Sequence, residues 1–193
     1  MDFLTFVTEA RSCRRFKEDQ PLTLANLDWL VECARVVPSA RNAQVIKFVE
    51  VLGAKAKEVF PLTHWAMALK DWGGPKDGER PTAFIGLAIP KDAAPIALID
   101  LGIVAQTIQL AAHSQGFGCC ILKSFDVAAT SKLLAIPEDL KLELLLGLGV
   151  ALEVRKVTDV PADGSLNYFR DSAGVHYVPK RSLEELVIKR FAD

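Results

Sequence analysis

The chain has 193 residues, half of them hydrophobic, and its 23 basic and 24 acidic side chains give a formal net charge of −1 at pH 7. A chain of this length typically forms one domain with a sizeable core, so we expect a single domain over residues 1–193. The balanced charge lacks the basic surface that binding to a phosphate backbone demands, which argues against nucleic acid as a partner.

The beginning of the chain and its cysteines favour a reducing compartment. The first residues, MDFLTFVTEARSCRR, place their charges after the apolar stretch and lack a small-residue cleavage site, unlike a secretory signal. The four cysteines show no disulfide-framework spacing, and the sequence contains neither a CxxC nor an HExxH motif. We therefore expect a cytoplasmic protein with reduced thiols and without a metal site.

Helical patterns and one strand pattern fill the first 62 residues. Asp2 and Thr23 are N-cap residues for two predicted helices, and a loop of sequence PSARNAQ follows the second helix. Alternating residues beyond the loop predict a first strand. The predicted elements are a helix over 2–10, a helix over 23–34, the loop over 38–44, a strand over 45–52 and a short helix over 56–62.

Residues 63–81 form a mixed segment of aromatic and polar residues that ends in the turn GGPKDGERP. Irregular segments of this length inside a compact domain are often functional. We interpret the segment as a short lid over a site, with Trp65, Met67 and Trp72 as candidates to line a substrate pocket.

The most apolar segment, residues 96–112, is predicted to be the helix around which the fold is built. It follows a strand over 83–89 that is apolar throughout and therefore central in its sheet. Asp100 is the only charged residue in the helix. A membrane span needs roughly 20 apolar residues, so we expect a buried helix and no membrane partner. Such a helix belongs in the core of a domain or in an interface between two chains.

Strands alternating with helices continue up to residue 154 and predict an α+β or α/β fold built in layers. The predicted elements are a strand over 117–122, a helix capped by Asp126 and reaching residue 134, and a strand over 141–151.

After residue 154 the character of the sequence changes. Residues 156–181 are typical of a loop, and Ser182 with Glu185 forms a capping box for a last helix that reaches Lys189. Because residues 156–193 have little of their own to fold against, we expect this C-terminal extension to wrap around a partner chain.

Two cationic segments are candidates for binding a phosphate group. Arg11, Ser12 and Arg14 combine guanidinium groups with a hydroxyl in one short turn. Lys180 and Arg181 directly precede a predicted helix N-terminus, which also favours anions. A solvated basic face is the alternative interpretation of both segments.

The amides of the 38–44 loop and the thiol of Cys13 also allow both a functional and a structural interpretation. Asn42 and Gln44 offer amide groups suited to the hydrogen-bonding edge of a planar heterocycle, although asparagine is also a routine turn residue. Cys13 lies among arginines, which would lower its thiol pKa and make it a nucleophile, although a structural thiol is the simpler interpretation.

Several common enzyme motifs are absent from the sequence. The GxG pairs at 116–118 and 147–149 fail the dinucleotide fingerprint, because the first follows a helix and the second lacks a third glycine. Neither a P-loop nor a GxSxG nucleophile elbow is present. The sequence motifs therefore favour neither a Rossmann dinucleotide site nor a serine hydrolase.

Taken together, five segments resemble the nitroreductase family of flavin enzymes. ARSCRRF resembles its RRSxRxF opening, and PSARNAQ resembles its PSxxNxQPW loop. DLGIVAQTIQLAAHSQGFGCCIL resembles its DxGxxxQxxxLAAxxxGLGxC core, LLLGLG its following strand, and VPKRSLEEL its basic C-terminal clamp. The segments occur in family order between residues 10 and 190.

The resemblance implies an α+β, nitroreductase-like three-layer fold, with a central, mostly antiparallel sheet flanked by helices, in an intertwined homodimer. One FMN would bind at each of two sites in the subunit interface. The residues that match the family's cofactor-binding segments are Arg11, Ser12, Arg14, Ser39, Asn42, Gln44, Ile121, Leu122, Lys123, Ser124, Lys180 and Arg181.

The resemblance also implies a role for each group. Arg11, Ser12 and Arg14 would hold the phosphate, ribityl chain and pyrimidine edge, and Arg181 with Lys180 would close on the phosphate. The loop amides with Ser39 would reach the flavin from the partner chain, and backbone N–H groups of residues 121–124 would approach flavin N5 and O4. The flavin would carry the chemistry, so no catalytic acid or nucleophile is expected.

The function implied is an FMN-dependent oxidoreductase that takes hydride from NADH or NADPH and reduces nitroaromatic or quinone-like acceptors by a ping-pong mechanism. One alternative is other flavin chemistry on the same scaffold, namely reductive dehalogenation or flavin fragmentation. Another is a non-enzymatic FMN-binding redox sensor that uses Cys13, Cys119 or Cys120. The sequence departs from the family at Ala10, where a second arginine is usual, and at Val45 and Ile46, where Pro-Trp is usual.

Overall fold

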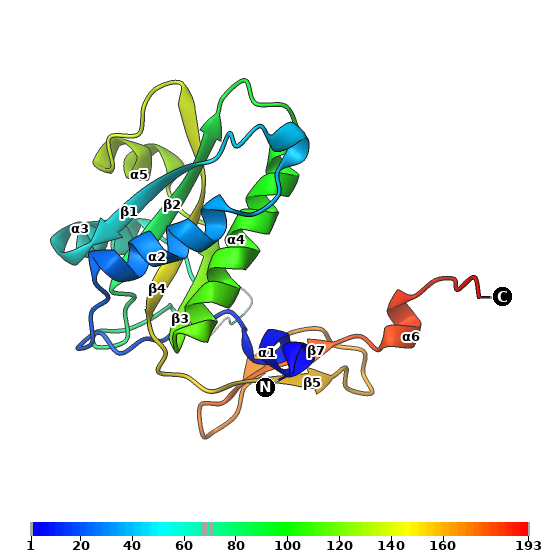
Figure 1. Cartoon of the computed structure of the whole chain (residues 1–193). Coiled ribbons are helices and arrows are strands. Elements are labelled where there is room, and N and C mark those ends of the chain that lie inside the picture. The colour runs from blue at the N-terminus through cyan, green and yellow to red at the C-terminus, as the bar shows by residue number, and fades with distance from the viewer. Residues whose placement is uncertain (1, 67–68, 70–71, 193) are drawn as a thin grey trace.

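The computed structural model describes residues 2–66, 69 and 72–192, and its centre is a four-stranded antiparallel sheet (Figure 1). The strand order is β1-β2-β4-β3. The strands are β1 (Lys47–Leu52), β2 (Ala83–Pro90), β3 (Phe117–Leu122) and β4 (Leu140–Val150). Strand β2 is buried along seven of its eight residues and lies inside the sheet, as its continuous apolar sequence predicts.

Helices cover both faces of this sheet and complete three layers (Figure 1). Ile85 and Leu87 on β2 pack on the face covered by α2 (Leu24–Arg35) and α4 (Ala97–Ser114). Phe84 and Ala88 point to the other face, which α3 (Gly53–Val59) and α5 (Val127–Leu133) cover. The predicted α+β fold with an antiparallel sheet between helices is confirmed.

Helix starts agree with the predicted caps, because each capping side chain accepts a hydrogen bond from a backbone N–H of the first turn. The capping residues are Asp2 for α1 (Phe3–Glu9), Thr23 for α2, Asp126 for α5 and Ser182 for α6 (Leu183–Leu186). Two 3₁₀ turns, η1 (Ala40–Asn42) and η2 (Phe60–Leu62), complete the helical elements. Helix α6 is shorter than predicted, since Val187 is already extended.

The prediction of a loop over residues 156–181 is wrong, because three short strands form a second sheet there. They are β5 (Arg155–Asp159), β6 (Phe169–Arg170) and β7 (His176–Lys180), in the order β5-β7-β6. Charged residues in β5 and a proline in β7 hide the alternation by which strands are recognised. Residues after β7 extend away from the body of the chain (Figure 1).

Helix α4 has one buried and one exposed apolar face. Leu101 and Ile108 are buried against the sheet, whereas Leu98, Ile99 and Ile103 are exposed. Within the described residues, no helix, α4 included, is long and apolar enough to cross a membrane. One face of α4 therefore lies in the core of this chain. The other face is exposed, and the expected interface with a second chain stays a prediction.

Candidate functional site

The segment between α1 and residue 17 is held against the ends of β3 and β4 by backbone hydrogen bonds. Cys13 N–H donates to Cys119 O (2.9 Å), and Lys17 N–H donates to Val150 O (2.8 Å). A Cβ placed on Gly118 would lie 2.5 Å from Cys13 Sγ, so the glycine allows this close approach. Gly118 of the first GxG pair thus serves packing, and the position of the segment determines where Arg11 and Arg14 lie.

A pocket of about 150 Å³ brings together the two cationic segments that the sequence singles out. Arg11, Ser12 and Arg14 contribute from the N-terminal segment and Lys180 from the end of β7. The other lining residues are Ala10, Gln106, Gln109, Tyr168, His176 and Val178. Sequence reasoning did not select Tyr168 or His176 as site residues, because neither lies in a recognisable motif. Arg181 does not line this pocket and pairs with Glu185 on α6 (3.2 Å).

The two neighbouring arginines have different roles. Arg15 forms a bidentate ion pair with Glu79, with distances of 2.9 and 2.6 Å, and this contact lowers the pKa of Glu79. Arg14 instead turns toward the pocket, where its Nη1 lies 3.3 Å from His176 Nε2 and its guanidinium group lies 4.8 Å from the centre of the Tyr168 ring. Arg15 is therefore structural, and Arg14 is available to a ligand.

Positive charge is concentrated behind the pocket and only partly compensated. Glu153, which is buried, accepts hydrogen bonds from Arg14 N–H (2.5 Å) and Arg170 Nη2 (2.8 Å). Arg155 Nη1 donates to Arg11 O (3.0 Å), and burial together with the charge of Arg155 lowers the pKa of Arg11. The Nε atoms of Arg11, Arg155 and Arg170 are buried without a partner among the described residues. Of these three arginines only Arg11 lines the pocket, so an anion there would offset the repulsion between Arg11 and Arg155 and offer Arg11 an acceptor.

The loop with Ser39, Asn42 and Gln44 lies beside the first turn of α4, whereas the pocket meets α4 further along, at Gln106 and Gln109. The carboxylate of Asp100 in the first turn of α4 accepts the Ala40 N–H (3.0 Å), so the one charged residue of the helix anchors the loop. Phe6 of α1 packs on His113 in the last turn of α4, so α1 lies beside this end of α4 (Figure 1). Asp100 and Gln106 are six residues apart, a rise of about 9 Å along α4, and none of Ser39, Asn42 and Gln44 lines the pocket of Arg11 and Arg14.

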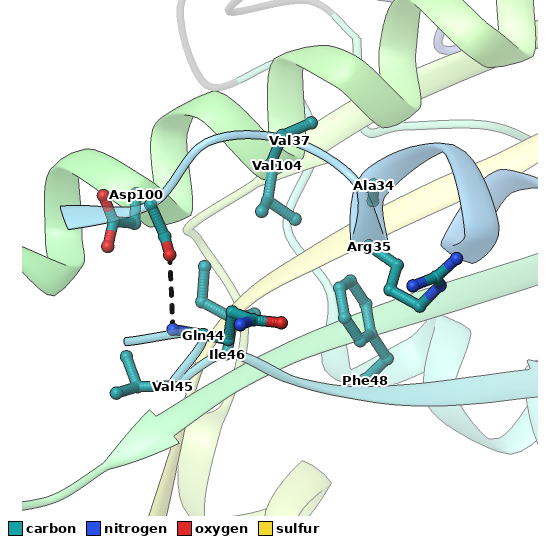
Figure 2. A pocket seen from close by; sticks show the side chains of 10 residues that line it. Ala34, Arg35, Val37, Gln44, Val45, Ile46, Phe48, Asp100 and Val104 are labelled. Carbon is teal, nitrogen blue, oxygen red and sulfur yellow. Dashed lines mark hydrogen bonds between the residues drawn. The ribbon is translucent and has the colours of Figure 1, made fainter. Parts of the chain in front are cut away.

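Figure 2 shows a cavity that Gln44, Val45 and Ile46 line together with Ala34 and Arg35 at the end of α2. The cavity measures about 120 Å³, and Gln44 N–H donates to Ser39 Oγ (3.3 Å) at its edge. Gln44 Nε2 donates to Asn42 O (3.2 Å), and both residues have positive φ values of 48° and 54°. Such strained conformations in residues other than glycine often mark a functional loop.

Residues 121–124 lie at the end of β3 and beyond it. Ile121 packs on the face of the sheet covered by α4, and Leu122 is buried on the other face. Lys123 pairs with the buried carboxylate of Glu143, and Ser124 O accepts the His64 N–H (2.9 Å). The side chain of Lys123 is thus occupied within the chain, whereas the resemblance requires only backbone N–H groups of this turn.

The candidate substrate-lining residues lie in different surroundings. Trp65 is 6% exposed, and a Cβ on Gly147 would lie 2.8 Å from its ring, so Trp65 packs on the sheet over this glycine. Trp72 lies under the guanidinium group of Arg170 at 4.2 Å. Met67 lies outside the described residues.

The thiols of Cys13, Cys119 and Cys120 are buried and weakly acidic. Burial raises the pKa of Cys13 to about 11 and that of Cys120 to about 12, and it also raises the pKa of Cys119. The sequence-based hypothesis of a lowered pKa at Cys13 is therefore wrong, because loss of hydration outweighs the neighbouring arginines. Within the described part of the chain, His, Cys, Asp and Glu do not gather into a group of three that could hold a metal ion.

Several solved structures of nitroreductases share this fold. A putative nitroreductase from Desulfovibrio desulfuricans, solved in complex with FMN, is 19% identical with a TM-score of 0.69, and the match covers 98% of this chain and 97% of that one. A nitroreductase family protein from Streptococcus pneumoniae is 20% identical with a TM-score of 0.68, over 84% of this chain and 97% of that one. An FMN-dependent nitroreductase from Clostridium difficile is 21% identical with a TM-score of 0.65, over 80% and 90%.

At the level of sequence, a search of curated proteins gave no significant match. The model of the nitroreductase family, however, matches residues 7–150. This range contains Arg11, Ser12 and Arg14, the 38–44 loop, α4 and the whole four-stranded sheet. The chain belongs to the nitroreductase family.

Proposed function

We propose that the protein is an FMN-dependent oxidoreductase that takes hydride from NADH or NADPH and passes it to a nitroaromatic or quinone-like acceptor. The cationic pocket between Arg11, Arg14 and Lys180 is the observation that carries this proposal. It is electropositive, has buried hydrogen-bond donors without partners, and lies in a chain of a family with FMN-binding members. When bound, FMN would supply the hydride-accepting and hydride-donating chemistry.

The chain's own residues would bind and orient the cofactor. Arg11, Ser12 and Lys180 suit the phosphate and the ribityl chain, because they combine two cations with a hydroxyl. Arg14, held by Glu153 and His176, would place a fixed positive charge at the pyrimidine edge, where reduction adds electron density. Arg181 would close on the phosphate after exchanging its Glu185 partner, and the turn over 121–124 would offer backbone N–H groups.

We further propose that the site is completed in a homodimer. A pocket of about 150 Å³ is smaller than the roughly 300 to 1,000 Å³ typical of sites that enclose a whole small molecule. The exposed face of α4 offers an apolar surface for a second copy. Pairing two α4 helices in opposite directions would bring the partner's 38–44 loop, with its Ser39, Asn42 and Gln44 amides and hydroxyl, toward the pocket.

The C-terminal extension fits the same assembly. Leu183, Leu186, Ile188 and Phe191 are exposed on a segment that leaves the body of the chain (Figure 1). Apolar side chains in such a segment gain stability only when another surface covers them. We propose that this surface belongs to the partner chain.

Steady-state kinetics tests the reaction. With NADH or NADPH as donor and a nitroaromatic or a quinone as acceptor, double-reciprocal plots are expected to be parallel, and turnover is expected to survive Cys13→Ser. Converging lines would contradict the ping-pong mechanism. Bound FMN without turnover of either acceptor would favour other flavin chemistry or a non-enzymatic redox sensor, whereas turnover that survives the substitution would remove the sensor alternative.

A further inference from the structure

His176 occupies a position in the cationic pocket that the family motifs do not describe. It is the first residue of β7, its side chain is fully buried, and its backbone N–H donates to Val154 O (2.9 Å). Its ring lies 5.2 Å from the ring of Tyr168, and its Nε2 lies 3.3 Å from Arg14 Nη1. The second sheet therefore brings an imidazole into direct contact with the arginine that faces the ligand site.

The contact with Arg14 determines where the imidazole carries its proton. A guanidinium group has only donors, so His176 Nε2 must accept, and the hydrogen of the neutral ring must be on Nδ1. Burial and the positive charge of Arg14 lower the pKa of His176 to about 4, which keeps the ring neutral near pH 7. This Nδ1–H is buried and has no hydrogen-bond partner among the described residues.

A buried donor without a partner is costly, and a ligand acceptor that meets it recovers the cost. His176 lines the same pocket as Arg11, Ser12 and Lys180, the residues suited to a phosphate. A phosphate oxygen is the acceptor that this charge pattern favours. A ligand without the phosphate would leave the Nδ1–H and the cations without partners, which is how polar sites reject such analogues.

We propose that His176 is a specificity-determining residue, which holds Arg14 through Nε2 and donates its Nδ1–H to the flavin's phosphate, so that the site selects FMN over riboflavin. This inference rests on the proposed FMN binding. The His176 Nδ1–H also provides a hydrogen-bond donor in the pocket that Ala10 lines, and Ala10 is the position where the family usually has another arginine.

Two substitutions test the roles of Nδ1 and Nε2 of His176 separately. His176→Gln keeps an acceptor near the Nε2 position and so keeps Arg14 in place, but it removes the Nδ1–H. We expect FMN binding to weaken tenfold or more, with riboflavin binding changed less than threefold. His176→Asn keeps an N–H near the Nδ1 position and loses the contact with Arg14, so both flavins are expected to weaken by a similar factor. Titration by quenching of flavin fluorescence measures the dissociation constants of both flavins for the unaltered protein and the two variants.

An unchanged ratio of FMN to riboflavin affinity in a folded His176→Gln variant would overturn the phosphate contact. If the unaltered protein binds neither flavin, the proposed function fails as well, and the two failures are thereby distinguishable. NMR of the imidazole nitrogens in the unaltered protein tests the same claim without a substitution. A neutral Nδ1–H ring that responds to FMN and not to riboflavin is expected, and an Nε2–H tautomer would contradict it.

Discussion

Replacing Ile99 with glutamate is expected to split the proposed homodimer and to release FMN with it. Ile99 is 60% exposed in the single chain and lies on the outer face of α4 beside Ile103 and Leu98. Burying an unpaired carboxylate costs roughly 4 kcal/mol or more, and two-fold symmetry places the substitution in the interface twice. The dimer dissociation constant should therefore rise by about a thousandfold or more.

Sedimentation velocity and FMN titration on the same samples measure this result. Val127→Glu is the matched control, because Val127 is also exposed and apolar but begins α5, and an acidic residue is favourable in the first turn of a helix. The control is expected to remain dimeric with FMN bound. If the Ile99→Glu variant also remains dimeric with FMN bound, the outer face of α4 is not the interface.

Replacing Lys180 with alanine is expected to weaken FMN binding by about tenfold to a hundredfold. The side chain closes the cationic pocket from the end of β7, and hydrogen bonds to a charged group contribute roughly 1.5 to 3 kcal/mol. The loss should be smaller at high salt, because screening already weakens the contact in the unaltered protein. Riboflavin binding should change little, since the contact is with the phosphate.

Lys156→Ala is the control for this substitution, because it removes the same charge from an exposed position on β5 and Lys156 does not line the pocket. Isothermal titration calorimetry at low and moderate salt compares the two variants. Equal effects of both substitutions would show that only net charge matters and that Lys180 does not contact the phosphate.

Local sequence patterns predicted most of the fold because they depend on residues close together in the chain. The caps at Asp2, Thr23 and Asp126 begin helices, and the apolar run of β2 lies inside the sheet. The second sheet was missed because β6 has only two residues and depends on pairing with β7. Strands of this kind carry little signal of their own.

The candidate site could be predicted only in part, because its electrostatics depend on residues far apart in the sequence. Family motifs selected Arg11, Arg14 and Lys180, which one pocket brings together. They could not show that Glu79 engages Arg15, since 64 residues separate that pair. Nor could they identify His176, whose role follows from a contact across 162 residues.

The thiol of Cys13 shows the same limit of sequence reasoning. Neighbouring arginines suggested a lowered pKa, but backbone pairing with β3 buries the side chain completely and raises the pKa instead. Burial is set by tertiary packing, and a list of neighbouring residues does not contain it.

FMN binding is the central claim, and a visible absorption spectrum of the freshly purified protein tests it most directly. We expect the two visible bands of an oxidised flavin, which should bleach when NADH or NADPH is added without oxygen and return when an acceptor is added. A colourless protein that also fails to take up added FMN would contradict the account. Arg11, Arg14 and Lys180 would then be a basic surface without a flavin partner.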